Sequence, residues 1–319
     1  MTNECSPDQE TLTPAPVAPV APMAARTKML LEAPVLPTLL RLSLPNVLNL
    51  LAIAGMITFD GLFLGRLGAD ALIGVSLVFP FVMFVQHVAA SGVGGAVSSA
   101  IARALGAGAK QRADALAAHA FVLAIGMTIV FSALMLTTGP LIYKAMGGRG
   151  PALDAALAYS NVVFGGAISV WMLNILANVV RGTGNMSLPA QVLVGSVLGH
   201  IALSPILIFG WGPVPALGPA GAGWGLVLSF AAGSVVLFLY LRSGRALVKL
   251  PLRGVRYEWH LFKDILRVGV PGIANVAINN LAVIIITSIA GRLSQSAAIG
   301  YAVGARLEYF ISSCKGSAT

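Results

Sequence analysis

Charge is scarce in this sequence, and the scarcity excludes an ordinary soluble domain. Asp, Glu, Lys and Arg make up 10% of the 319 residues, whereas hydrophobic residues make up 57%. A typical soluble domain carries about 25% charged residues. The mean hydropathy is +0.87. So few polar atoms cannot cover a surface that faces water, and we expect the chain to lie in a lipid bilayer.

Cysteine and catalytic motifs are also scarce. Cys5 and Cys314 lie near opposite ends and offer neither a disulfide framework nor a metal site.

The net charge of +9 comes from basic residues between apolar blocks, without interleaved aromatic residues, so we expect no nucleic-acid partner. No paired carboxylates, HExxH or GxSxG motif occurs. We therefore expect no enzyme, no catalytic residue and no cofactor.

Long charge-poor stretches are what the sequence has instead. A helix needs roughly 20 apolar residues to cross a bilayer. The Pro- and Gly-rich stretch 210–223 is a loop that divides one long apolar block into two spans. An eighth span begins near residue 297. The seven complete predicted spans are helices within 42–65, 71–102, 115–143, 155–180, 182–241 (two spans) and 268–291.

The basic residues predict the orientation of these spans. When alternate loops are assigned to one side, 14 Lys and Arg residues gather there, including Arg103, Arg112 and Arg267, and 4 gather on the other. Loops rich in Lys and Arg stay in the cytoplasm. The sequence therefore predicts a cytoplasmic N-terminus.

A shift of 226 residues aligns the chain with itself. "LLRLSLPNVLNLL" (39–51) then matches "ILRVGVPGIANVA" (265–277), and "GRLGADALIG" (65–74) matches "GRLSQSAAIG" (291–300). Six spans followed by a restart in the same orientation indicate parallel repeats, which are typical of transporters. We predict an all-α integral membrane protein, with a six-helix repeat and the first one to two helices of a second. The second repeat is expected to be truncated.

This interpretation divides the chain into five segments. The first is expected to be a disordered leader because it is rich in Pro and Ala and cannot form a core. The segments are the leader (1–33), the amino-terminal six-helix lobe (34–245), a basic cytoplasmic linker (246–264), the start of a carboxy-terminal lobe (265–310) and an aberrant tail (311–319).

Asp60 is the only charged residue between Arg41 and Arg66. An ionisable group inside a membrane usually faces a cavity and has a function. The alternative is that Asp60 is a solvated acid near a helix end. His200 lies well inside the fifth span and is either a proton relay or a neutral, hydrogen-bonded structural residue. His87 and His119 have no acidic neighbour at helical spacing, and we expect structural roles for both.

Four asparagines are further candidates. Asn174 and Asn178 share a helix face, where interhelical hydrogen bonding is the simpler explanation and substrate contact the alternative. Asn279 and Asn280 in the seventh helix are predicted to face a cavity as a pair.

Several segments in this order resemble the multidrug and toxic compound extrusion (MATE) transporters. They are "FDGLFLGRLGADAL" (59–72), "SGVGGAVSSAIARALGAGAKQRADALA" (91–117), "NVVRGTGNMSLPA" (178–190), "SPILIFG" (204–210) and "LGPAGAGWGLVLS" (217–229). The resemblance covers about residues 36–310. It implies a twelve-helix, two-lobed exporter in a bacterial inner membrane, which exchanges protons or sodium ions for bulky, mostly cationic drugs.

The resemblance also assigns a site. Asp60 occupies the position of the family's first-helix Asp, and His200 and Ser204 stand where the family has Asn and Asn or Asp. Asn279 stands where some members have Glu. Because acids are replaced, protons are favoured over sodium. Two alternatives are a lipid-linked saccharide flippase, which the lack of Lys and Arg inside the spans disfavours, and a non-functional fragment.

Overall fold

The computed structural model describes residues 35–211, 215–244, 246–250, 258–293, 300–301 and 304. Side chains are described from residue 51 onward, except at 282 and 291. Residues 1–42 and 43–319 form separate compact units, of which the first is described only as the helical stretch 35–42. All packing below concerns residues 43–319.

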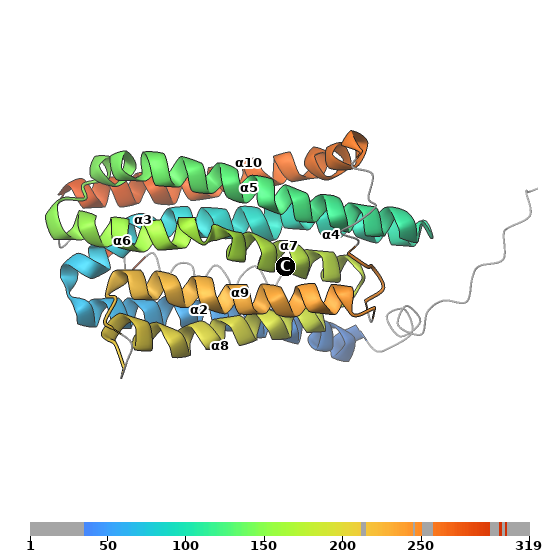
Figure 1. The fold of residues 1–319 in the computed structure, drawn as a ribbon, viewed down its shortest axis with the longest axis horizontal. Coiled ribbons are helices and arrows are strands. Elements are labelled where there is room, and N and C mark those ends of the chain that lie inside the picture. The colour runs from blue at the N-terminus through green and yellow to red at the C-terminus, as the bar shows by residue number, and fades with distance from the viewer. Residues whose placement is uncertain are drawn as a thin grey trace, which may run out of the picture. The chain divides into compact units, whose positions relative to one another are not determined.

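The described residues are almost entirely helical, as predicted (Figure 1). The helices are α2 (Val35–Leu67), α3 (Ala69–His87), the π-helix η1 (Val88–Gly92), α4 (Val93–Gly106), α5 (Lys110–Ala145), α6 (Gly150–Gly165), α7 (Ala167–Gly182), α8 (Ser187–Phe209), α9 (Pro219–Arg242) and α10 (Trp259–Leu293). Among the described residues, five helical segments are long and apolar enough to cross a membrane, and the bent pair α6–α7 can add a sixth.

The second predicted span is one 38-residue helical segment with a π-helical turn in its middle. A π-turn widens the helix and misaligns its backbone hydrogen bonds. Asn178 on α7 donates from Nδ2 to the carbonyl oxygen of Ala90 in this turn at 3.0 Å. A side chain at Gly94 would overlap the Asn178 amide. The neighbouring helix therefore supports the irregular backbone.

The fourth predicted span is broken into α6 and α7, which meet at an angle of 47°. Ser132 on α5 donates from Oγ to the carbonyl oxygen of Phe164 at 2.6 Å, beside the break. Any side chain at Gly166 would collide with Val227 on α9. Glycine thus allows the bend, and a hydroxyl group satisfies a backbone acceptor next to it.

Small residues let the helices approach closely. α3 packs along α6 and α8 along α9, while α7 lies against α4, α5 and α9. Gly74 brings the backbone of α3 onto that of α6 near Ala156, and Gly221 brings α9 onto α8. The largest fully buried side chains include Trp171, Phe164 and Phe230.

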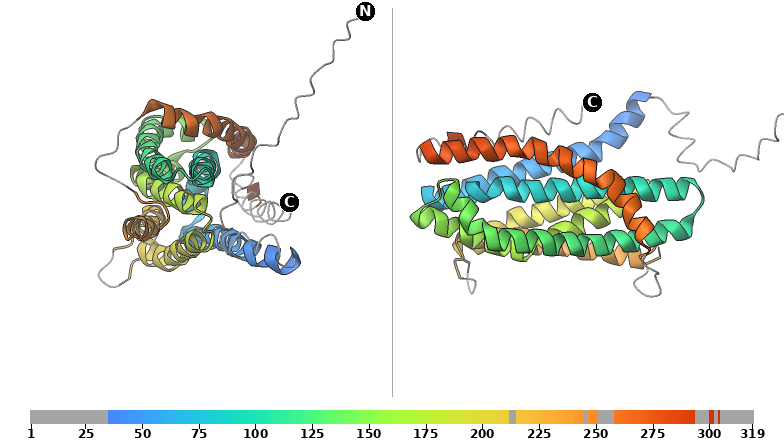
Figure 2. Two further views of the ribbon diagram at one scale, coloured as in Figure 1. Left: turned by 90° about the vertical axis from the view of Figure 1, so that its right-hand side faces the viewer. Right: turned by 90° about the horizontal axis from the view of Figure 1, so that it is seen from above.

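α10 has about the length expected for a second copy of α2. Both helices continue through a proline, Pro45 in α2 and Pro271 in α10, and these prolines are 226 positions apart. α10 packs on α3, η1, α4 and α5 (Figure 2). At this contact, Gly272 lies against Gly92.

The predicted segment boundaries stay predictions, and several are not described. α10 begins at Trp259, so its first turns belong to the segment 246–264 that was predicted as the basic linker. The leader (1–33) and the tail (311–319) lie outside the described residues. The predicted start of an eighth helix, near 297, falls where only residues 300–301 and 304 are described.

Candidate functional site

Asp60 on α2 and His200 on α8 are in hydrogen-bonding contact, although 140 residues separate them in the sequence. Nε2 of His200 lies 2.8 Å from Oδ1 and 3.0 Å from Oδ2 of Asp60. Ser204, one helical turn after His200, donates from Oγ to Oδ1 at 3.4 Å. The structure thus brings together the three residues that were predicted as the coupling site.

A proton must lie between His200 and Asp60. A carboxylate oxygen and a deprotonated ring nitrogen are both acceptors, and two acceptors 2.8 Å apart repel each other. The contact is stable only if Nε2 or the carboxyl group carries hydrogen. The pair therefore holds at least one exchangeable proton.

Burial isolates this proton from bulk water. The side chain of His200 is 1% exposed and that of Asp60 is 17% exposed. Nδ1 of His200 is buried against the backbone of α9 at Gly225 and has no partner of standard hydrogen-bond geometry among the described residues. A side chain at Gly225 would press on both His200 and Ser204, so glycine there lets α9 seal the site.

Asp60 also borders a small cavity of about 20 Å³, which is large enough for one water molecule. Apolar side chains from α2, α3 and α9 and the ring of Tyr159 on α6 line it. Sequence reasoning missed Tyr159 and Gly225, because nothing in their local patterns separates them from packing residues. The lining residues are Met56, Ile57, Val75, Phe79, Val82, Met83, Tyr159 and Leu226.

Asn174 and Asn178 are buried at the contact of α7 with the second span. Each donates from Nδ2 to the carbonyl oxygen one turn earlier in its own helix, at 2.9 Å. Each amide also reaches across: Asn174 to Oε1 of Gln86 at 3.5 Å and Asn178 to Ala90. These contacts favour the interhelical role over substrate contact. Gln86 was not among the predicted residues.

The structure separates Asn279 from Asn280. Asn280 is 5% exposed and donates to the carbonyl oxygen of Val276 at 2.9 Å. Asn279 is exposed and lies at the limit of hydrogen bonding with Asn275, at 3.5 Å. The two amides therefore lie in different environments. A role in lining a cavity remains a prediction for both.

His119 has structural contacts, whereas His87 lies at the end of α3 next to η1. The backbone N–H of Glu258 donates to Nε2 of His119 at 3.0 Å, and Nδ1 faces the carbonyl oxygen of Ala115 at 2.7 Å. His119 thereby ties the start of α10 to α5. Among the described residues, no group of three or more His, Cys, Asp or Glu side chains could hold a metal ion.

These features define a polytopic membrane protein with an ionisable pair in its interior, an arrangement typical of ion-coupled transporters. A family model described as MatE matches residues 45–206. The chain belongs to this MATE family, whose members are transporters rather than enzymes.

Two curated relatives and one solved structure illustrate the similarity. The chain is 28% identical to an FAD transporter of Shewanella oneidensis, over 88% of this chain and 62% of that protein. It is 29% identical to the probable multidrug resistance protein NorM of Thermotoga maritima, over 85% and 58%. An inward-facing multidrug resistance MATE transporter of the MOP superfamily superposes with a TM-score of 0.71 at 28% identity, covering 81% and 59%. The chain thus spans about three-fifths of these relatives' lengths.

Proposed function

We propose that this chain forms the proton-coupling lobe of an antiporter that exports bulky, mostly cationic compounds. The contact between Asp60 and His200 carries the proposal, since it holds a proton inside an apolar helical bundle. A cationic substrate and a proton that compete for one carboxylate give antiport, because binding of one favours release of the other. Relatives named as multidrug resistance proteins support this substrate class.

The site favours a proton over a sodium ion. A hard metal cation takes several oxygen ligands. At Asp60 the described side chains supply the carboxylate and one hydroxyl group, Ser204, and a ring nitrogen of His200 lies within 3.0 Å of both carboxylate oxygens. A donor in this position occupies the carboxylate edge where sodium would bind.

We place the chain in a bacterial inner membrane with its N-terminus in the cytoplasm. The 14-to-4 distribution of Lys and Arg supports this orientation.

The proposal can be tested by measuring ethidium binding to the purified, detergent-solubilised chain. A cation and the proton held between Asp60 and His200 compete for the site, so affinity should rise as the pH rises, by up to about tenfold per pH unit for one displaced proton. Asp60→Asn should abolish the rise, and Asp60→Glu should retain part of it. His200→Gln replaces the imidazole donor with an amide donor that cannot titrate, so it should change the pH profile if His200 relays protons.

Asp154→Asn is the matched control, because it makes the same chemical change at an exposed position of α6. It should leave the pH dependence unchanged. A wild-type pH dependence in Asp60→Asn would contradict the coupling role. In vesicles with an imposed pH gradient, ethidium flux should follow the same order of variants.

The similarity to the FAD transporter favours a second candidate, an anionic dinucleotide substrate. Loss of the proton from the Asp60–His200 contact makes the site more negative, so affinity for FAD should fall where affinity for ethidium rises. Binding of FAD with this opposite pH dependence, and none of ethidium, would replace the cationic substrate class.

A further inference from the structure

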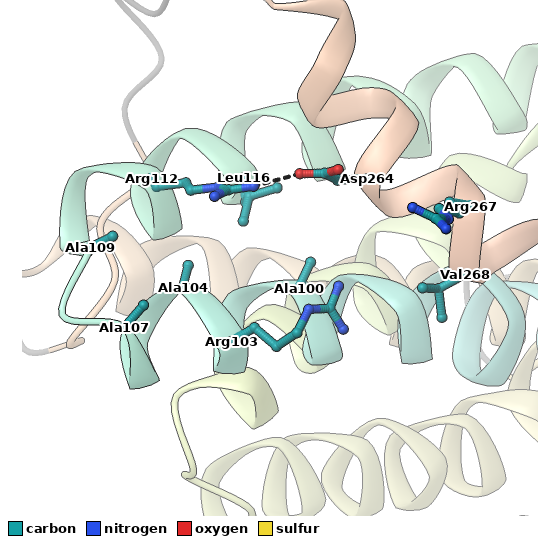
Figure 3. Close-up of a pocket in the computed structure, with 10 residues that line it drawn as sticks. All are labelled: Ala100, Arg103, Ala104, Ala107, Ala109, Arg112, Leu116, Asp264, Arg267 and Val268. Atoms are coloured by element: carbon teal, nitrogen blue, oxygen red, sulfur yellow. Dashed lines mark hydrogen bonds and ion pairs between the residues drawn. The ribbon is translucent and has the colours of Figure 1, made fainter. Parts of the chain in front are cut away.

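A second cavity, of about 470 Å³, lies far along the chain from Asp60, where the end of α4, the start of α5 and the first turns of α10 meet (Figure 3). We call it the arginine cavity, defined by Arg103, Arg112, Asp264 and Arg267. None of these residues takes part in the site at Asp60.

The arginine cavity has an excess of positive charge. Arg112 and Asp264 form an ion pair at 2.6 Å, with side chains 55% and 40% exposed. Arg103 donates from Nη1 to the hydroxyl group of Ser99 at 2.5 Å. Neither Arg103 nor Arg267 has an ion-pair partner within the described part of the chain. One carboxylate therefore faces three guanidinium groups.

The walls leave room for a ligand. Between the arginines the lining consists of small or apolar side chains, which can neither neutralise the guanidinium groups nor fill the space. In Figure 3, Arg103 and Arg267 flank Val268, while Arg112 turns toward Asp264. Arginine presents several N–H donors in a planar fork that matches the oxygens of a phosphate group. The apolar lining residues are Ala100, Ala104, Ala107, Ala109, Leu116 and Val268.

We propose that the arginine cavity binds a phosphate-bearing anion, either the headgroup of an anionic lipid or free phosphate, through Arg103 and Arg267. Basic pockets between helices at the cytoplasmic side of a membrane suit anionic headgroups. Arg103 lies on α4 and Arg267 on α10, so an anion shared by both holds the first helix of the second repeat against the first repeat. Binding here does not depend on transport or on the coupling ion.

The test compares two probes on the full chain in detergent. Inorganic phosphate, titrated against chloride at equal ionic strength, should raise the melting temperature. In native mass spectrometry, phosphatidylglycerol should be retained in preference to phosphatidylcholine. In the double variant Arg103→Gln/Arg267→Gln, the apparent affinity for phosphate and the retained fraction of phosphatidylglycerol should each fall at least tenfold.

The double variant Lys110→Gln/Lys263→Gln is the matched control. It removes two positive charges from the same region, at exposed positions of α5 and α10 that do not line the cavity. It should bind both probes as the wild type does. Stabilisation by phosphate without retention of phosphatidylglycerol would identify a free-anion site. Retention of phosphatidylglycerol, with or without phosphate binding, would identify a headgroup site. Failure to bind either probe, or equal losses in both double variants, would overturn the proposal.

Discussion

At the scale of single residues, position within the bundle decides which polar groups can act in coupling. Asp60 and His200 face each other, so a change in the charge of one is felt directly by the other. Asn174 and Asn178 lie four residues apart on one helix, but their donors are taken by carbonyl groups and by Gln86. We expect the first pair to exchange a proton, whereas the contacts of the second pair hold helices together.

Asn178→Leu should destabilise the protein more than Asn174→Leu. Both changes remove a bond to the preceding turn, but Asn178→Leu also leaves the Ala90 carbonyl in the π-turn without its 3.0 Å donor. A hydrogen bond between membrane helices contributes about 0.6 kcal/mol on average and up to about 1.7. We expect about 1 kcal/mol for Asn178 and less for Asn174, whose link to Gln86 is 3.5 Å long. Thermal unfolding in detergent measures the difference, and equal losses would contradict the bracing role.

The sequence predicted the ionisable members of the site but not its surroundings. Asp60 and His200 are recognisable because such groups are rare inside apolar spans. The two residues lie on different helices and are 140 positions apart in the sequence, so spacing alone could not predict their contact. Ser204 was assigned only through the family resemblance. Tyr159 and Phe79 line the small cavity, but the sequence around them does not differ from that around residues that face lipid.

At the scale of helices, gaps between charges predicted where spans lie, because charged residues mark helix ends. The π-turn in Val88–Gly92 and the break at Gly166 were not predicted. Both depend on groups from other helices: Asn178 at the first and Ser132 and Val227 at the second. Hydropathy reports burial in lipid and contains no information on such contacts.

Glycine substitutions should separate close helix packing from helix propensity. A Cβ atom at Gly74 would overlap the carbonyl oxygen of Ala152 and lie 2.8 Å from the backbone nitrogen of Ala156, so Gly74→Ala must push α3 away from α6. We expect a loss of about 1–3 kcal/mol. At Gly126, in the interior of α5, a Cβ atom meets nothing within 4 Å.

Gly126→Ala is the control, and it should leave stability unchanged or raise it by up to about 1 kcal/mol, because alanine favours helix more than glycine does. Equilibrium unfolding in mixed micelles of detergent and dodecyl sulfate can compare both variants with the wild type. A Gly74→Ala protein as stable as Gly126→Ala would show that α3 and α6 do not pack as closely as described.

At the scale of the whole molecule, the helical order separates the basic loops from the others. The end of α4, the start of α5 and the start of α10 meet at the arginine cavity, whereas Arg292 near the end of α10 donates to the carbonyl oxygen of Ala145 at the end of α5. α5 and α10 therefore run in the same direction. Their basic N-terminal ends lie together, and so do their C-terminal ends. This arrangement agrees with the alternation of loops on which the predicted orientation depends.

Labelling of single cysteines tests that direction. With Cys5 and Cys314 replaced by serine, Gln111→Cys places a thiol at the exposed start of α5, and Leu217→Cys places one in the loop before α9, where Leu217 is 38% exposed. An impermeant maleimide should label Leu217→Cys in intact cells and Gln111→Cys only after permeabilisation, because 14 of 18 loop Lys and Arg residues share the side of Gln111. The reverse pattern would invert the topology and move the arginine cavity to the outer face. Labelling of both thiols from outside would contradict the assignment of α5 and the loop before α9 to opposite sides.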